Sequence, residues 1–510
     1  MTTKPKHLVW IVTGLLLSLF IAAMDQTVVS TSLGTIIADL GGMDQYVWVT
    51  IAYLLTELAL MPIYGKLSDM YGRKLFFVFG IGMFLAGSVL CGIATNISEL
   101  IFFRALQGIG GGALIPIAYT MIYSIIPLEK RGSIGGLFGA AFGLASIFGP
   151  LIGSYITEYL SWHWVFYINV IPGIVSLALI LMFYHESYVR IKQKIDFLGA
   201  FTLIASIVSG ILALELGGSK YPWNSGAIIS LFFVCGVLLC TFLFVETKAT
   251  DPIIPLKLFT NRLFATSCGL AFLYGSAYVV FVFYIPMFVQ GVLGHAATNS
   301  GLILTPLLVS SILGSMSGSF SIKNITGYRN TMLFSAIILV IGIILSRMLS
   351  VNTTQLEVTM LMIVIGIAVG FSFSVPTIGV NQSVEMSNRG TANATLDFLR
   401  SAGMLIGVAV YGSMQENMFT NKIREISGSR NEGHFKGIDL NAMLTPETRA
   451  QIPHDILNPL SGALSYSLSH MFMWILVPSV VIMAAAILMP NEKMLVGKHV
   501  KSDGATNHFD

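Results

Sequence analysis

The sequence predicts an all-α membrane protein in which fourteen transmembrane helices form two six-helix bundles with a two-helix hairpin inserted between them. Three observations support this fold class. Of the 510 residues, 55% are hydrophobic and only 10% are charged, whereas a soluble globular domain carries about 25% charged residues. The apolar residues gather into runs of membrane length. Short motifs that follow these runs recur in the second half of the chain.

The apolar runs give the predicted spans. A helix needs about 20 mainly apolar residues to cross the hydrocarbon core of a bilayer. Fourteen runs meet this length: 9–33, 46–65, 75–95, 99–124, 133–156, 163–184, 197–216, 226–245, 263–290, 298–320, 331–349, 357–382, 391–413 and 466–489. The first run is longer than the apolar part of a signal peptide, so we expect it to remain in the membrane.

The basic residues orient the predicted spans. With the N-terminus in the cytoplasm, the cytoplasmic segments hold 19 of the 28 Lys and Arg residues, and the short external loops hold two. Because cytoplasmic loops are enriched in basic residues, we expect a multi-pass protein of the plasma (inner) membrane with both termini inside. The net charge of +3 is small, and the chain has no basic block, so nucleic acid is not an expected partner.

An internal repeat divides the chain. Lys130-Arg-Gly132 follows the fourth run and Asn388-Arg-Gly390 follows the twelfth, and each leads into a helix rich in glycine and alanine. Two repeats of six spans leave the seventh and eighth runs as an insertion. The predicted units are an N-terminal bundle at 1–185, a hairpin at 186–250, a C-terminal bundle at 251–490 that contains an external loop at 415–465, and a cytoplasmic tail at 491–510. Parallel repeats with a binding site at their interface are a transporter layout.

Asp25, Glu57 and Arg104 are charged residues inside the membrane-length runs of the N-terminal bundle. A charged side chain at the centre of a membrane helix costs about 2.5–3.5 kcal/mol on translocon-based scales. We therefore expect Asp25 and Glu57 to face the protein interior or a water-filled path, where a carboxylate can exchange protons or bind a cation. Arg104 is either a residue near a helix end whose charge reaches the membrane interface, or a partner that changes how readily these acids bind protons.

One segment carries a family resemblance. Gly65-Lys-Leu-Ser-Asp-Met-Tyr-Gly-Arg-Lys74 resembles the signature loop of the major facilitator superfamily at every defining position. Its two glycines permit a tight turn. Asp69 and Arg73 can pair with each other or with a neighbouring helix end. The resemblance implies the major facilitator fold and a gating loop that consists of Gly65, Asp69, Gly72, Arg73 and Lys74.

Other segments resemble motifs of the fourteen-span drug:proton antiporters within this superfamily. They are Met24–Val29 in the first run, Arg104–Gly110 in the fourth, Gly143–Gly153 in the fifth and Trp162–Asn169 after it. The resemblance implies a role for Arg104 in proton coupling, and an antiporter helix that contains Gly143, Gly149, Pro150 and Gly153. Glycines spaced four residues apart also line one face of this helix, which allows close helix contact.

Two further sets of residues are candidates for the site. Asp397 and Arg400 are three residues apart and can pair on one helix face, either as a structural ion pair or as a second coupling pair. The substrate-cavity candidates are Tyr53, Gln107, Tyr274, Tyr278 and Phe281. A carboxylate with aromatic faces suits a lipophilic cation, while the alternative for each aromatic residue is ordinary packing.

Together these patterns predict a proton-coupled multidrug efflux antiporter that exports lipophilic, often cationic, small molecules by alternating access. ATP is not an expected energy source, because no G-x-x-x-x-G-K-[ST] loop occurs. Neither enzyme activity, a cofactor nor a metal site is expected, and we expect a monomer in the lipid bilayer. Two alternatives remain open: a proton-coupled exporter of one physiological solute, such as a siderophore, peptide or amino acid, and a membrane ligand sensor that does not transport.

Overall fold

The computed structural model describes residues 5–40, 45–126, 196–218, 221–294, 297–427 and 454–492, and most of 141–186. Regular structure within these ranges is helical, apart from an isolated bridge between Gly217 and Tyr221. Twelve of the described helices or helix pairs are long and apolar enough to cross a membrane. A helix satisfies its backbone hydrogen bonds internally, which is what a segment without access to water requires.

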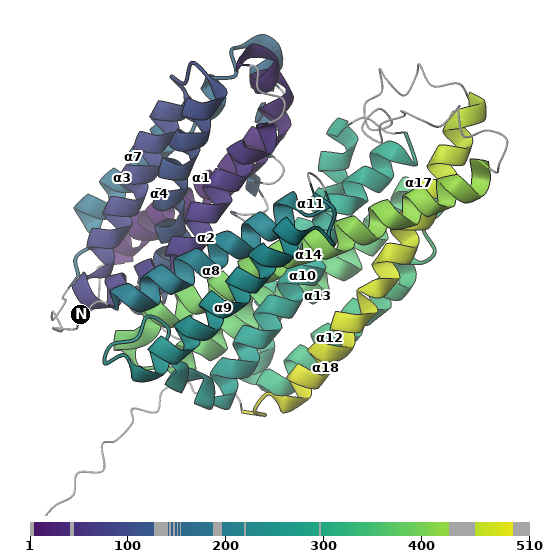
Figure 1. The fold of residues 1–510 in the computed structure, drawn as a ribbon. Helices are drawn as coiled ribbons and strands as arrows, with labels where there is room; N and C mark the ends of the chain where they lie inside the picture. The colour runs from purple at the N-terminus through teal and green to yellow at the C-terminus, as the bar shows by residue number, and fades with distance from the viewer. Residues whose placement is uncertain are drawn as a thin grey trace, which may run out of the picture.

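The helices of the first part of the chain pack together (Figure 1). They are α1 (Pro5–Leu40), α2 (Tyr46–Tyr71), α3 (Arg73–Cys91), α4 (Ile97–Ile125), α6 (Trp164–Tyr167) and α7 (Val170–Phe183). Helix α4 lies between α2 and α3, while α7 packs on α1 and α3. Small residues allow the close contact: a Cβ on Gly110 of α4 would lie within 2.2 Å of the backbone nitrogen of Phe84 on α3.

The helices of the last part form a second group. They are α10 (Arg262–Gly291), α11 (Ala297–Asn324), α12 (Tyr328–Ser346), α13 (Gln355–Ser383), η3 (Met386–Asn388), α14 (Arg389–Ser427), α17 (His454–Trp474) and α18 (Leu476–Leu488). Helix α13 packs on α11 and α12, and α14 packs on α10 and α17. The two groups touch where α14 meets α2 and α4. In Figure 1 the ribbons of the two groups converge near this contact and diverge toward the opposite end of the molecule.

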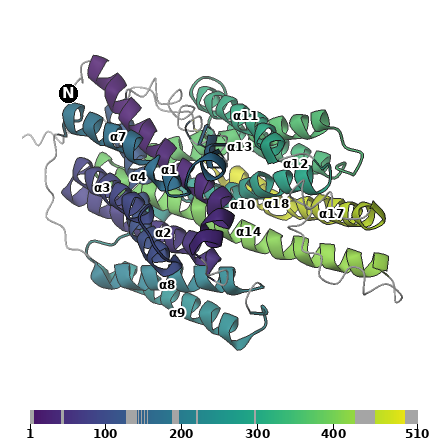
Figure 2. The ribbon, with the colours of Figure 1, turned by 90° about the horizontal axis from the view of Figure 1, so that it is seen from above.

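A pair of helices lies along one edge of the junction between the groups (Figure 2). The pair is α8 (Phe197–Leu216) and α9 (Gly226–Lys248), followed by η2 (Leu256–Thr260). Helix α8 contacts both α2 and α14, whereas α9 packs mainly on α8. Ile211 of α8 belongs to one apolar cluster with Leu58 of α2 and Leu405 of α14. This helix therefore covers the seam between the two groups.

Local sequence sets where several helices begin. The side chains of Asp196, Ser225 and Asn261 accept hydrogen bonds from backbone N–H groups in the first turns of α8, α9 and α10. Thr354 and Glu357 form a capping box at the start of α13. These caps satisfy donors that the helix itself leaves unpaired.

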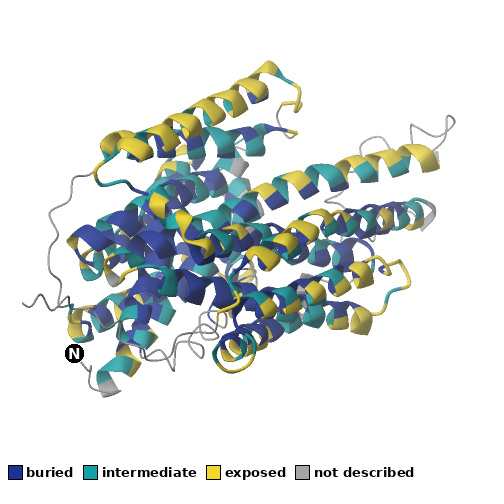
Figure 3. Ribbon diagram, turned by 90° about the horizontal axis from the view of Figure 1, so that it is seen from below, coloured by how far each residue is buried: buried dark blue, intermediate teal, exposed yellow. Residues whose placement is uncertain are grey.

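The outward faces of the helices are apolar, as expected for a protein in a bilayer. Figure 3 shows buried residues where helices meet and exposed residues on the outward faces. Many of the exposed side chains are large and apolar, among them Phe201 (67%), Phe233 (71%) and Phe244 (60%) on α8 and α9. An apolar surface of this extent is unfavourable in water and favourable against lipid.

The structure corrects parts of the predicted organisation. Fourteen spans are not confirmed, because the described residues contain twelve candidate spans. The predicted span 133–156 lies largely outside the described residues, and the 28-residue helix α11 is not among the twelve. Both edges of the predicted external loop 415–465 are helical, since α14 continues to Ser427 and α17 begins at His454. A 39-residue helix that ends in charged residues cannot be recognised from an apolar run alone.

Candidate functional site

Asp25 on α1 lies at the centre of a buried polar network. Its side chain is 0% exposed. Arg104 of α4 donates to Oδ2 at 2.5 Å, and Gln107 of the same helix donates to Oδ1 at 2.8 Å. Asn169, the N-cap residue of α7, donates to Oδ1 at 2.8 Å. The carboxylate is thus held by one cation and two amides that come from two other helices.

Arg104 is the largest fully buried side chain of this network, at 1% exposed. Its guanidinium also donates to the backbone oxygen of Val49 at 3.2 Å and to Oε1 of Gln107 at 2.7 Å, and it lies 4.4 Å from the centre of the Tyr53 ring. The helix-end alternative for Arg104 is therefore wrong, because the side chain points into the group of helices and not toward an interface. Tyr53 and Gln107, two of the cavity candidates, are part of the same network.

Sequence reasoning did not single out Asn169 as a site residue. It lies in Trp162–Asn169, whose resemblance to a motif of the fourteen-span antiporters assigns it no role in the site. Its amide nitrogen bonds Asp25, and its Oδ1 is buried without a partner among the described residues. A polar residue at the start of the strongly apolar helix α7 is the signal that could have identified it.

Glu57 on α2 is 5% exposed and lies close to the Asp25 network. Its Oε2 accepts a hydrogen bond of 3.1 Å from Gln26, the residue that follows Asp25 on α1. Among the described residues no basic side chain forms an ion pair with Glu57, although the charges of Arg104 and Asp25 act on it. Two buried carboxylates therefore differ in their surroundings: Asp25 is paired with a cation, and Glu57 is held by one amide.

The segment Gly65–Lys74 joins the two groups of helices, and the end of the molecule where it lies is called the gating end below. Asp69 accepts hydrogen bonds from the backbone nitrogens of Gly390 (2.9 Å) and Thr391 (2.7 Å), in the first turn of α14. Arg73 lies 3.6 Å from the same carboxylate. A carboxylate at a helix N-terminus is favourable because it satisfies free N–H groups and meets the positive end of the helix dipole.

The two glycines of this segment have different roles. Gly72 has a φ of 108° between α2 and α3, so it makes the turn that the sequence predicted. Gly65 is helical and makes no turn. A Cβ there would lie 2.3 Å from Cβ of Ala394 and 2.9 Å from the backbone oxygen of Gly390. Gly65 therefore allows α2 and α14 to approach each other closely.

Arg73 and Lys74 also fix α3 to α7 within the first group. Their backbone nitrogens donate to the two carboxylate oxygens of Glu186, each at 3.0 Å. The Lys74 ammonium donates to the backbone oxygens of Leu181 and Tyr184 at the end of α7. Within the signature segment, it is therefore the Gly65–Asp69 part that reaches α14.

Asp397 and Arg400 form the ion pair that their spacing predicted, at 2.7 Å. Both side chains are at least 90% buried on α14. The Arg400 guanidinium lies 5.3 Å from the ring centre of Phe373 and 3.5 Å from the Thr377 hydroxyl of α13. Within the part of the chain that the structure describes, Asp25–Arg104 and Asp397–Arg400 thus form buried ion pairs in the first and second groups of helices.

The remaining cavity candidates lie in the second group of helices. Tyr274 is 1% exposed and its hydroxyl is 2.6 Å from that of Ser335. Phe281 is 0% exposed and stacks on Phe472. Tyr278 packs edge-on against Phe373. In this conformation these three rings fill contacts between helices.

The predicted antiporter helix is only partly described. Gly143 and Pro150 lie outside the described residues, while Gly149 and Gly153 lie in helical turns. A Cβ on Gly149 would come within 1.9 Å of the Thr27 hydroxyl on α1. The same hydroxyl donates to the backbone oxygen of Ala145 at 3.2 Å. This helix therefore packs directly beside the turn that follows Asp25.

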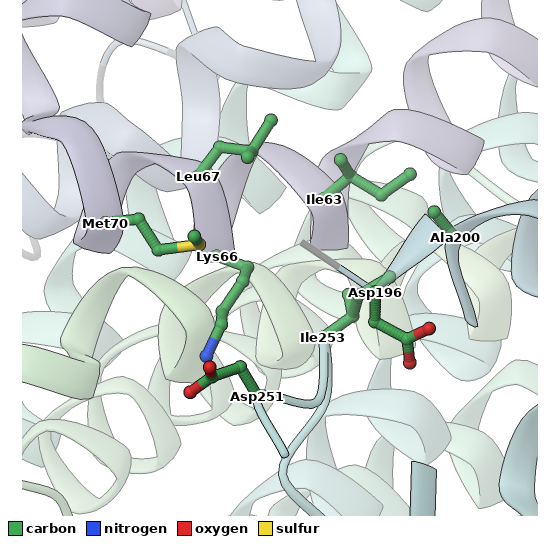
Figure 4. Close-up of a pocket in the computed structure, with 8 residues that line it drawn as sticks. All are labelled: Ile63, Lys66, Leu67, Met70, Asp196, Ala200, Asp251 and Ile253. Carbon is green, nitrogen blue, oxygen red and sulfur yellow. The ribbon is translucent and has the colours of Figure 1, made fainter. Parts of the chain in front are cut away.

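A small cavity lies where the base of α8 and α9 meets α2 (Figure 4). Its volume is about 20 Å³, which is room for about one water molecule and far below the several hundred Å³ of a drug site. In Figure 4 the ammonium of Lys66 points toward the carboxylate of Asp251, with Asp196 on the other side. The charges of Asp251, Asp69 and Glu246 act on Lys66. This cluster therefore links the α8–α9 pair to the gating end.

A helical protein with many membrane-length helices, a buried ion pair in each of two helix groups and a closed contact between these groups has the architecture of a membrane transporter. A family model of the Major Facilitator Superfamily matches residues 15–408. The chain belongs to this superfamily and is a multi-pass membrane transporter of small molecules.

Individual proteins agree with this assignment. The chain is 48% identical over 493 residues to "Multidrug resistance protein 3" of Bacillus subtilis, which covers 96% of both chains. It is 36% identical over 417 residues to "Multidrug transporter protein MdtP" of the same organism, covering 81% of this chain and 77% of the relative. The structure of the human organic anion transporter MFSD10 has the same fold, with a TM-score of 0.59, 13% identity and coverage of 94% of this chain and 100% of that one. The family and these relatives are transporters, not enzymes.

Proposed function

We propose that this protein is a proton-coupled multidrug efflux antiporter that exports lipophilic, often cationic, compounds by alternating access. The Asp25 site carries the proposal: a fully buried carboxylate within a membrane-length helix is paired with Arg104 and lies beside a second buried carboxylate, Glu57. Intramembrane acids of this kind mark proton and ion pathways. The name of the 48% identical relative supports drugs as the substrates.

The pairing gives a way for protons to drive a conformational change. A proton on Asp25 removes the negative charge that compensates Arg104, and an uncompensated buried charge is strongly destabilising. Protonation therefore favours an arrangement in which Arg104 gains another partner or reaches water. Glu57 is the second carboxylate whose charge interacts with Arg104, and it is the better candidate for binding a cationic substrate because it has no ion-pair partner among the described residues.

The gating-end contacts belong to the closed half of the cycle. With Asp69 bound to the first turn of α14 and Gly65 packed on Ala394, α2 and α14 leave no passage between them at this end. Export requires this end to open toward the cytoplasm, so that substrate enters, and to close again before release. Gly65, Asp69, Gly72, Arg73 and Lys74 form the gate in this proposal.

The driving force is adequate for such exchange. A charge that crosses 100 mV gains about 2.3 kcal/mol, and each pH unit adds about 1.36 kcal/mol per proton. One proton exchanged for a monovalent cation moves no net charge and uses only the pH difference. If Asp25 and Glu57 both carry protons, the exchange also draws on the membrane voltage. In that case Glu57→Gln changes the stoichiometry and voltage dependence of transport, and unchanged values would limit coupling to Asp25.

We also propose the topology that the basic residues indicate. The gating end faces the cytoplasm with both termini, bundles at 1–185 and 251–490 flank an inserted hairpin at 186–250, and the protein acts as a monomer of the fourteen-span antiporter branch. The packing of α8 and α9 along the seam between α2 and α14 supports an inserted pair of helices. Labelling of single cysteines from either side of the membrane tests the orientation.

The decisive experiment is transport of a monovalent cationic dye into inverted membrane vesicles. With an imposed pH gradient, wild-type protein should accumulate the dye, and a protonophore should abolish accumulation. Asp25→Asn should lose gradient-driven uptake while still exchanging dye down its own gradient. Gradient-driven uptake by Asp25→Asn at the wild-type rate would refute the role of Asp25, and no gradient-dependent flux of any compound would favour a ligand sensor. Competition by a single metabolite but not by varied cations would favour a specific exporter.

A further inference from the structure

A second polar contact joins the two groups of helices, deeper than the Asp69 contact. Asn393 on α14 donates to the Thr120 hydroxyl on α4 at 3.2 Å. Asn393 lies three residues beyond Gly390, which places it about 4.5 Å further along the helix from the gating end. Thr120 is 0% exposed and Asn393 is 1% exposed. The contact is therefore sealed from solvent on both sides.

Asn393 is held in place by a second amide. Asn381 on α13 donates to Oδ1 of Asn393 at 2.9 Å, and Asn393 donates back to Oδ1 of Asn381 at 3.2 Å. Asn381 is 1% exposed and also donates to the backbone oxygen of Thr377 at 2.8 Å. Two buried amides are costly inside a membrane protein unless they are satisfied. Here the two amides form hydrogen bonds with each other within the second group of helices, and these bonds do not depend on the contact with α4.

This arrangement makes the contact with Thr120 reversible. When α4 and α14 separate, Asn393 loses Thr120 but keeps Asn381, and the Thr120 hydroxyl keeps its bond of 2.8 Å to the backbone oxygen of Pro116. Separation therefore breaks one hydrogen bond and leaves both side chains with another hydrogen-bond partner. A contact of this kind can stabilise a closed state without preventing its opening.

The hydrogen bonds of Asn381 and Asn393 extend to the ion pair of the second group. Thr377, whose backbone oxygen accepts from Asn381, presents its hydroxyl 3.5 Å from the Arg400 guanidinium. Arg400 is in turn paired with Asp397, one turn beyond Asn393 on α14. Buried polar groups thus run without a break from Asp397 to Thr120.

We propose that Asn393, positioned by Asn381, is the inner layer of the gate and that its bond to Thr120 stabilises the state closed at the gating end. The Asp69 contact is the outer layer. The inference rests on the proposed alternating access, and it adds residues outside the family signature segment. Because a neutral hydrogen bond is involved, its removal shifts the ratio of closed to open molecules about 2- to 10-fold.

Spin-label distances across the gate test this inference. The four cysteines, Cys91, Cys235, Cys240 and Cys268, are first replaced by alanine. Labels are then placed at Tyr71 on α2 and Ser387 before α14, which are both exposed at the gating end on opposite sides of the contact. Pulsed electron paramagnetic resonance of the purified full chain in nanodiscs gives the populations of short and long distances.

Three variants separate a gate from ordinary packing. Thr120→Val keeps the volume but loses the hydroxyl, and should raise the open population 2- to 10-fold. Thr120→Ser keeps the hydroxyl and should retain the wild-type distribution. Thr395→Val is the matched control, because Thr395 is 1% exposed on α14 and its hydroxyl, among the described residues, donates to the backbone oxygen of Thr391 in its own helix at 2.8 Å. It should also match wild type.

Each remaining outcome has a defined meaning. Equal distributions for Thr120→Val and wild type would overturn the inner layer, as would an equal shift in Thr395→Val. Asn393→Leu tests the same hydrogen bond from its other partner. The double variant Asn393→Leu/Thr120→Val should shift the populations no further than Asn393→Leu alone. Additive shifts would overturn the pairing of Asn393 with Thr120. If wild-type protein shows a single distance with or without dye and at every pH, alternating access itself fails, which is a distinct result.

Discussion

Replacing Gly65 by alanine should open the gating end. The added Cβ would lie 2.3 Å from Cβ of Ala394 and 2.9 Å from the backbone oxygen of Gly390. Neither neighbour is the end of a flexible side chain, so the conflict cannot be relieved by a rotamer change. Two carbons in contact are normally about 3.5–4.0 Å apart, and α2 must therefore move away from α14 by more than about 1 Å.

The expected magnitude follows from the Asp69 contact four residues along the same helix. A displacement of about 1.2 Å along the 2.7 Å bond from Thr391 lengthens it to about 3.9 Å, beyond hydrogen-bonding distance. A hydrogen bond to a charged group contributes about 1.5–3 kcal/mol. Loss of even one such bond in the closed state shifts the ratio of closed to open molecules about tenfold or more.

Gly82→Ala is the control for this substitution. Gly82 lies on α3, and a Cβ there would meet no atom within 4 Å. Both substitutions gain about 1 kcal/mol of helix propensity, so a general effect on helix stability would be common to the two. The spin-label pair at Tyr71 and Ser387 should report a larger open population for Gly65→Ala alone. Identical distributions in the two variants would refute the close-approach argument.

Substitutions at three other residues test further parts of the structure. Asn169→Leu removes a donor to Asp25 worth about 1.5–3 kcal/mol; gradient-driven dye flux should fall about tenfold or more, and wild-type flux would exclude Asn169 from the coupling site. Lys66→Met removes a charge that interacts with Asp251 and Glu246, and it should speed hydrogen exchange at the start of α8 and the end of α9. Lys66→Arg keeps the charge and should not. Equal exchange in the two variants would contradict this electrostatic interaction. Tyr274→Phe deletes the hydroxyl bonded to Ser335 and should lower stability by about 1 kcal/mol without changing dye affinity, whereas weaker binding at unchanged melting temperature would return Tyr274 to the substrate cavity.

Residues near each other in sequence were the most predictable part of the site. The Asp397–Arg400 pair follows from a spacing of three residues on one helix, and the turn at Gly72 follows from its place between two helical runs. Helix ends were less predictable: α14 continues to Ser427, well past its apolar stretch. Hydropathy reports contact with lipid, and it loses its signal where a helix leaves the membrane.

Contacts between distant segments needed the tertiary structure. Asn169 lies 144 positions from Asp25 along the chain, and Asn393 lies 273 positions from Thr120. Polar residues of this kind occur in many helices, and their partners depend on how the helices rotate and cross. No local pattern encodes that geometry.

The sequence by itself determined the class of this protein. Its apolar runs, sparse charges and signature segment indicate a helical membrane protein of the Major Facilitator Superfamily, because an apolar run of about 20 residues in lipid satisfies its backbone groups as a helix and tolerates few charges. Only the tertiary structure decided how those charges are used. It paired Asp25 with Arg104, left Glu57 with a single amide and joined α2 and α4 to α14. Each of these outcomes depends on which helix faces meet, and packing between segments far apart in the chain decides that.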